Sequence, residues 1–212
     1  MNKNADEYLD TINAAFALQE LETKFQKAID DSKDVKNQQA LTKLMDEQLS
    51  QLRAKEKLTQ YDVDRAEKLL QIEQARAQLE DTRSAKTSLR LKRDSQGNYS
   101  YVYTANEEEV QAAEDNLAKL QNDLYNFDKD AYRKNLDDML SAWKDFQSRY
   151  KEIVLDTSLT EEERVERLAL LRDQYGEYIN NKVAENEVIR TNLMTSAFES
   201  YTALYENDYQ SY

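Results

Sequence analysis

The sequence predicts an all-α protein, an elongated coiled coil or helical bundle with one β-hairpin inserted between two long helices. Three observations support this fold class. The 212 residues include no proline and only two glycines, whereas a soluble domain of this length would carry about 10 prolines and about 15 glycines. Charged residues make up 33% of the chain. Apolar residues recur three or four positions apart over most of its length, which is the spacing of helices rather than strands.

The first two helices are predicted over about 5–29 and 35–87. Asp34 is a suitable N-cap for the second one. The apolar spacing of this second segment slips in phase once, between Leu52 and Leu58. We nevertheless expect one continuous helix of about 50 residues, which would be about 75 Å long. Such a length favours a coiled-coil arm or a long bundle helix.

Residues 88–104 change from helical to strand periodicity. The first part, 88–93, alternates apolar and basic residues, and the last part, 99–104, is rich in tyrosine and β-branched residues. Between them, Asp94 favours a turn and Gly97 can take the left-handed conformation that closes a hairpin. Leu89 and Leu91 should share one face with some of three tyrosines: Tyr99, Tyr101 and Tyr103. Because a two-stranded element is marginal alone, we expect these tyrosines to pack on helices or on a partner.

Two more helices are predicted over about 106–154 and 160–205. Asn106 and Thr160 are suitable N-caps, and three glutamates follow each of them. In the earlier helix, apolar residues alternate steps of three and four with one skip, which is a strong coiled-coil signal. Its large aromatic residues favour a multi-helix bundle over a two-stranded coiled coil. The predicted seam consists of Leu117, Leu120, Leu124, Phe127, Leu136, Met139, Trp143 and Phe146.

We treat residues 1–212 as a single elongated helical domain. The two helices that flank the hairpin can fold back as an αα-hairpin with the β-turn at its tip. The segment from Tyr201 to Tyr212 carries four tyrosines and no terminating cap, which is the pattern expected of a fragment cut from a longer chain.

The composition excludes several classes of function. Without cysteine or histidine, the chain has no thiol nucleophile, no Ser-His-Asp triad, no disulfide and no ordinary zinc site. A net charge of −13, from 42 acidic and 29 basic residues, disfavours nucleic acid as a partner. No apolar stretch approaches the ~18 residues that a membrane span needs. The first residues contain no apolar h-region, so we expect no signal peptide among them.

The turn of the predicted hairpin partly resembles a calcium-binding loop. Asp94, Gln96 and Asn98 are spaced like the start of a calcium loop, but glycine comes one position too early and Ala105 stands at the twelfth position. Turn geometry explains the run better. Paired glutamates could bind a di-metal centre, but the usual Glu-x-x-His partner is impossible here. We therefore expect no metal, no cofactor and no enzymatic activity.

The hairpin and its flanking helices, over 82–130, resemble a helix–hairpin–helix segment of large virion proteins of tailed bacteriophages, often labelled tail tape-measure proteins. The most specific stretch is R-L-K-R-D-S-Q-G-N-Y-S-Y-V-Y at 90–103. The resemblance implies a structural role in a phage particle, and no catalytic residue carries over. Tape-measure proteins are commonly much longer and often include apolar segments, so this chain would be a domain of one or a shorter virion protein.

Two functions follow as hypotheses. In the first, the chain is a coiled-coil spacer and assembly scaffold that is made in the host cytoplasm and located in the virion. Its partners are other copies or other virion proteins. In the second, it is a bacterial adaptor or secreted binding module that presents the hairpin tip to a protein partner. Tail or capsid genes beside this one would favour the first hypothesis, and secretion genes would favour the second.

Overall fold

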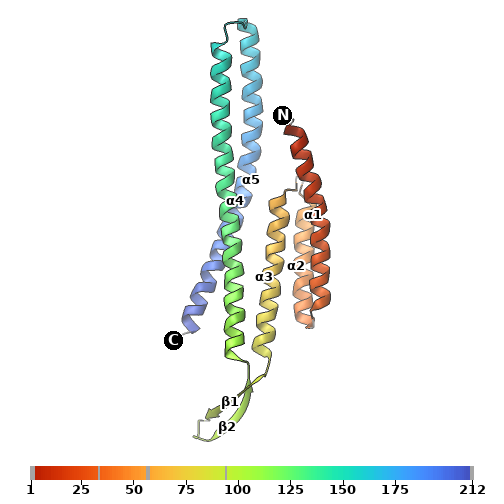
Figure 1. The fold of residues 1–212 in the computed structure, drawn as a ribbon, viewed down its shortest axis with the longest axis vertical. Helices are drawn as coiled ribbons and strands as arrows, with labels where there is room; N and C mark the ends of the chain where they lie inside the picture. The colour runs from red at the N-terminus through yellow and green to blue at the C-terminus, as the bar shows by residue number, and fades with distance from the viewer. Residues whose placement is uncertain (1–2, 33, 56–57, 94, 211–212) are drawn as a thin grey trace. The chain divides into compact units, whose positions relative to one another are not determined.

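The structure is a computed structural model that describes residues 3–32, 34–55, 58–93 and 95–210, with side-chain burial described from 12 to 202 within these ranges. The described chain is mostly helical, with five α-helices and one two-stranded antiparallel sheet (Figure 1). This confirms the predicted helical fold with a β-hairpin between helices. The coiled-coil geometry and the elongated shape stay predictions. The described residues form two compact units, of which the second is Tyr125–Tyr201.

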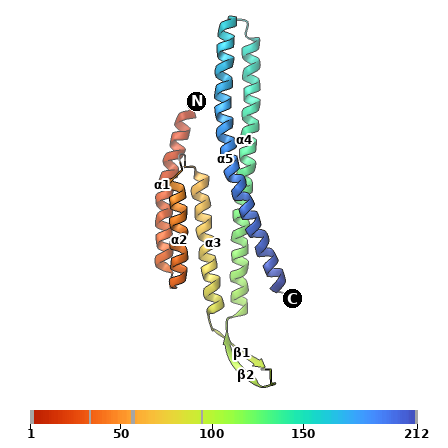
Figure 2. The ribbon, with the colours of Figure 1, turned by 180° about the vertical axis from the view of Figure 1, so that it is seen from behind.

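The first unit contains a bundle of three helices: α1 (Lys3–Asp31), α2 (Val35–Arg53) and α3 (Gln60–Ser84). Each of the three contacts the other two, and they lie side by side in both views (Figures 1 and 2). Apolar side chains from all three helices form one core, which consists of Leu21, Phe25, Ala28, Leu41, Leu52, Val63, Ala66 and Leu70.

The prediction of one continuous helix over 35–87 is wrong. The chain leaves α2 after Arg53 and starts α3 at Gln60, so the phase slip between Leu52 and Leu58 marks a break. A capping box starts α3, because Thr59 N donates to the Asp62 carboxylate (3.1 Å) and Asp62 N donates to Thr59 Oγ1 (3.4 Å). Folding back at this point brings Leu52 and Val63 into the same core. Two residues of the predicted helix, Glu56 and Lys57, lie outside the described residues.

The hairpin consists of β1 (Ser88–Arg93) and β2 (Tyr99–Thr104), as predicted. In its register Leu89 is opposite Tyr103, Leu91 is opposite Tyr101 and Arg93 is opposite Tyr99. Directly opposed residues point to the same face of a sheet, so the expected shared face of leucines and tyrosines is confirmed. Gly97 has φ +90°, the left-handed conformation predicted for it. Asp94 lies outside the described residues.

The last two helices are α4 (Glu107–Leu155) and α5 (Glu161–Gln210), which start within one residue of the predicted positions. Asn106 Oδ1 accepts from Glu108 N (3.1 Å) at the start of α4. At the start of α5, Thr160 N donates to Glu163 Oε2 (2.9 Å) and Glu163 N donates to Thr160 Oγ1 (3.3 Å). This reciprocal pair is a capping box. It fixes the turn at which the chain reverses from α4 into α5.

Within the second unit, α4 and α5 run antiparallel (Figure 1). Aromatic side chains of the two helices meet in one cluster. Phe146 of α4 and Tyr175 of α5 have ring centroids 4.7 Å apart, and Trp143 lies 5.8 Å from the same tyrosine ring. Trp143 and Phe146 also stack on each other at 5.6 Å. These separations are within the range of favourable aromatic pairs, so the cluster holds the two helices together near their shared turn.

Candidate interaction surfaces

Exposed apolar side chains are distributed very unevenly along the described residues. Of twenty large apolar side chains that are exposed, only Phe16 and Val35 belong to the three-helix bundle. The hairpin carries six of them and the second unit carries twelve. Conversely, Ile189 is the one buried apolar side chain among the described residues of the second unit. The bundle therefore has a closed core, whereas the hairpin and the second unit leave apolar surface open.

The hairpin presents one apolar face, which we call the hairpin face. It consists of Leu89, Leu91, Tyr99, Tyr101 and Tyr103, whose exposed fractions run from 53% to 71%. The Arg93 guanidinium lies 5.7 Å from the centroid of the Tyr99 ring on the same side, within the range of a cation–π interaction. We expected these tyrosines to pack on helices or on a partner. In the structure they are not covered by any described helix.

The opposite face of the hairpin is basic. Arg90 and Lys92 alternate with the residues of the hairpin face along β1 and are exposed. Arg90 forms an ion pair with Glu107 in the first turn of α4. The hydrogen bond from Arg90 lowers the pKa of the Glu107 carboxyl below its usual value. An exposed ion pair thus links the hairpin to the start of α4.

The structure places the predicted seam residues of α4 at three levels of burial. Leu124 is buried, with 1% of its surface exposed, whereas Leu136 and Trp143 are each 42% exposed. The other members are half-buried: Leu117, Leu120, Phe127, Met139 and Phe146. The seam prediction itself stays untested, because burial within one chain does not show which positions meet a partner helix.

A buried polar stripe on α4 was missed by the sequence analysis. Gln121, Asp128 and Asn135 are buried, with at most 7% of their surface exposed, and they are spaced seven residues apart. Such spacing places them on one face of the helix. The side-chain oxygens of Gln121 and Asn135 find no hydrogen-bond partner among the described residues. A search for apolar positions cannot find this stripe, but the seven-residue recurrence of polar residues could have indicated it.

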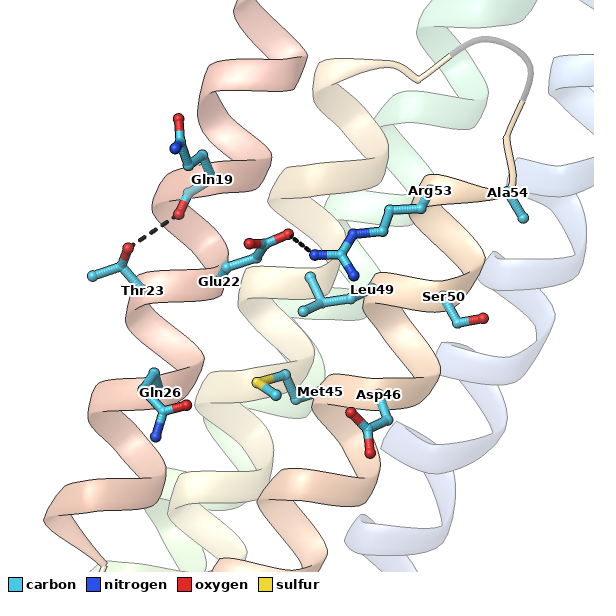
Figure 3. A pocket seen from close by; sticks show the side chains of 10 residues that line it. All are labelled: Gln19, Glu22, Thr23, Gln26, Met45, Asp46, Leu49, Ser50, Arg53 and Ala54. Carbon is cyan, nitrogen blue, oxygen red and sulfur yellow. Dashed lines mark hydrogen bonds and ion pairs between the residues drawn. The ribbon is translucent and has the colours of Figure 1, made fainter.

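An open groove lies between α1 and α2 (Figure 3). Figure 3 shows Glu22 and Arg53 pointing toward each other across it, and their ion pair measures 2.5 Å. The groove is lined by Gln19, Glu22, Thr23, Gln26, Met45, Asp46, Leu49, Ser50, Arg53 and Ala54. Its polar groups are two amides, two hydroxyls, one guanidinium and two carboxylates, of which Glu22 is paired with Arg53. This lining offers no converging acid–base pair. We assign no activity to the groove.

Two further features bear on function: clusters of metal ligands and helices that could span a membrane. Within the described ranges, no group of three or more acidic side chains lies close enough to hold a metal ion. None of the described helices combines the length and apolar character that a membrane span requires. The candidate site is therefore a set of interaction surfaces: the hairpin face and the exposed apolar side chains of the second unit.

Comparison with known proteins adds no relative: no family model, no curated protein and no solved structure matches the chain.

Proposed function

We propose that the chain is a structural protein of a tailed-bacteriophage virion, tape-measure-like or another internal virion module, in which its helices act as a spacer and assembly scaffold. The observation that carries this proposal is the open second unit. Twelve of its large apolar side chains are exposed, against one buried apolar residue among those described. Two helices alone cannot enclose such side chains, and exposed apolar surface of this extent marks a site of association.

The energetics favour association at high local concentration. Covering a half-exposed large apolar side chain contributes about 1 kcal/mol, so twelve of them contribute about 12 kcal/mol at most. The loss of translational and rotational freedom on association costs about 4–15 kcal/mol. Because the two terms are of similar size, association is moderate in strength and is favoured by a high concentration of the chain. The interior of a particle, where copies are held together, raises the local concentration above that of a solution and favours association further.

The resemblance of 82–130 to tail proteins supports the same proposal from the sequence side. The test is to quantify the chain in purified virions by mass spectrometry, after washing the particles in high salt. We expect a fixed number of copies per particle, with the major capsid protein of the same particles as the internal standard. If the chain stays in the lysate and is absent from washed particles, the virion proposal fails.

A second candidate, a bacterial adaptor or secreted module that presents the hairpin to a protein partner, is favoured by the exposure of the hairpin face. Tyr101 is its most exposed tyrosine, at 71%. In this case Tyr101→Ala should abolish partner capture and leave the helical circular-dichroism signal unchanged. Ser100→Ala, one residue away on the opposite face, is the matched control. Loss of folding in Tyr101→Ala would instead give the tyrosine a structural role.

A further inference from the structure

The hairpin is a basic element in an acidic protein. Residues 88–104 carry three basic side chains and one acidic one, whereas the whole chain carries 29 basic and 42 acidic residues. One hairpin cation, Arg90, already pairs with a glutamate in the first turn of a helix, Glu107. Lys92 is exposed and makes no ion pair with any residue that the structure describes. The hairpin therefore has charge left for an acidic partner.

A surface of matching chemistry lies on α5, and we call it the α5 stripe. Its members are separated by steps of four, three and four, which places them on one face of the helix. All are exposed, and the single apolar member, Leu170, is 58% exposed. The α5 stripe consists of Glu166, Leu170, Asp173 and Glu177.

The α5 stripe is free to receive cations. Its three carboxylates form no ion pair within the described part of the chain. The neighbouring Arg172 is directed to the ring of Tyr150, with 6.0 Å between its guanidinium and the ring centroid. The lengths also agree, because eleven residue steps along a helix cover about 17 Å and a strand of six residues covers about 17 Å.

We propose that the hairpin of one copy binds the α5 stripe of a second copy. Leu91 and Tyr101 of the hairpin face pack on Leu170, and Arg93 of the same face pairs with a carboxylate beside that leucine. Lys92 lies on the opposite face of the hairpin and adds only longer-range attraction. This contact specifies how copies of the proposed scaffold associate. It rests on the proposed function only because it requires self-association. Because each copy has one hairpin to insert and one stripe to receive it, the contact can close reciprocally in a two-fold dimer or build rings and open-ended chains. An overall charge of −13 disfavours nucleic acid in the same place.

A charge-swap experiment on the full chain tests this contact. The hairpin variant carries Lys92→Glu and Arg93→Glu, and the stripe variant carries Glu166→Lys and Asp173→Lys. Mass is measured by light scattering over a hundredfold concentration range. Each variant alone should associate at least about tenfold more weakly than the native chain, since like charges then face each other. An equimolar mixture should regain native association, because every hairpin then finds a stripe of opposite charge.

The control is Lys144→Glu with Lys151→Glu, which changes the net charge equally at exposed positions of α4 and should leave association unchanged. Recovery in the mixture also shows that both variants fold. The proposal is overturned if the native chain is a monomer, if the mixture does not recover, or if only the hairpin variant is affected. It is also overturned if the native chain binds a 20-nucleotide single strand and the hairpin variant does not. If the native chain associates and neither charge swap changes this, the proposed contact is wrong but the scaffold function is not contradicted. If the charge swaps act as expected but the chain is absent from virions, the contact is supported and the virion function is contradicted.

Discussion

At the scale of residues, burial separates two phenylalanines of the same helix that the sequence cannot tell apart. Phe25 is fully buried, with 0% exposed, and Phe16 is 68% exposed. Both belong to the helically spaced apolar residues that predict a helix over about 5–29. The difference arises because only Phe25 meets the core formed with α2 and α3. Contacts with elements distant in sequence decide such differences, so they could not be predicted locally.

Phe25→Ala should lower the free energy of unfolding by about 3–5 kcal/mol, since it leaves a cavity in a closed core. Phe16→Ala is the control on the same helix and should change it by less than about 0.5 kcal/mol. Thermal unfolding followed by circular dichroism measures both. Equal effects of the two substitutions would contradict the assignment of the core to the three-helix bundle.

Alanine substitutions at the two glycines should have opposite effects on stability. Gly97 has φ +90°, so Gly97→Ala should strain the turn by about 1 kcal/mol. Gly176 lies inside α5, and a Cβ there meets nothing within 4 Å. Gly176→Ala should therefore stabilise the protein by about 0.5–1 kcal/mol.

Hydrogen exchange of the β1 and β2 amides measures the first effect, and the melting temperature measures the second. Faster exchange in the hairpin of Gly97→Ala, with a raised melting temperature in Gly176→Ala, is the expected pair of results. Unchanged exchange at the hairpin would show that the left-handed turn is not required there.

At the scale of elements, the caps were predictable and the helix break was not. The capping box of Thr160 and Glu163 and the turn at Gly97 were indicated by local sequence, because capping and turn formation are local chemistry. The break between α2 and α3 appears in the sequence only as a phase slip. Whether a helix continues through such a slip depends on whether folding back buries more apolar surface. In the structure, Leu52 before the break and Val63 after it both belong to the core of the three-helix bundle.

The capping box of α5 gives a prediction about pH. The backbone hydrogen bond from Thr160 N holds the pKa of the Glu163 carboxyl below its usual value of 4.5. The folded state thus favours the charged carboxylate. Its contribution is present above about pH 4.5 and is lost as the pH falls through the lower pKa of the folded state. The melting temperature of Glu163→Gln should depend less on pH below 4.5 than that of the native chain. A steeper dependence in the variant would contradict this role.

At the scale of the whole molecule, the sequence predicted the fold class but not which surfaces would be open. The seam prediction relied on apolar residues, whereas the most buried positions of α4 include Gln121, Asp128 and Asn135. Buried polar groups weaken an apolar interface but can fix its register. The hairpin tyrosines were expected to be covered and are exposed. The exposed tyrosines could not be predicted, because a surface suited to a partner carries the same apolar residue pattern as a core.

The central claim is that the open surfaces of the hairpin and the second unit are covered by other copies of the chain. The most direct test is the absolute mass in solution, by light scattering on a sizing column over a hundredfold range of concentration. We predict masses at two or more times the 24.9 kDa of one chain, rising with concentration. A constant mass of 24.9 kDa at every concentration would contradict the claim.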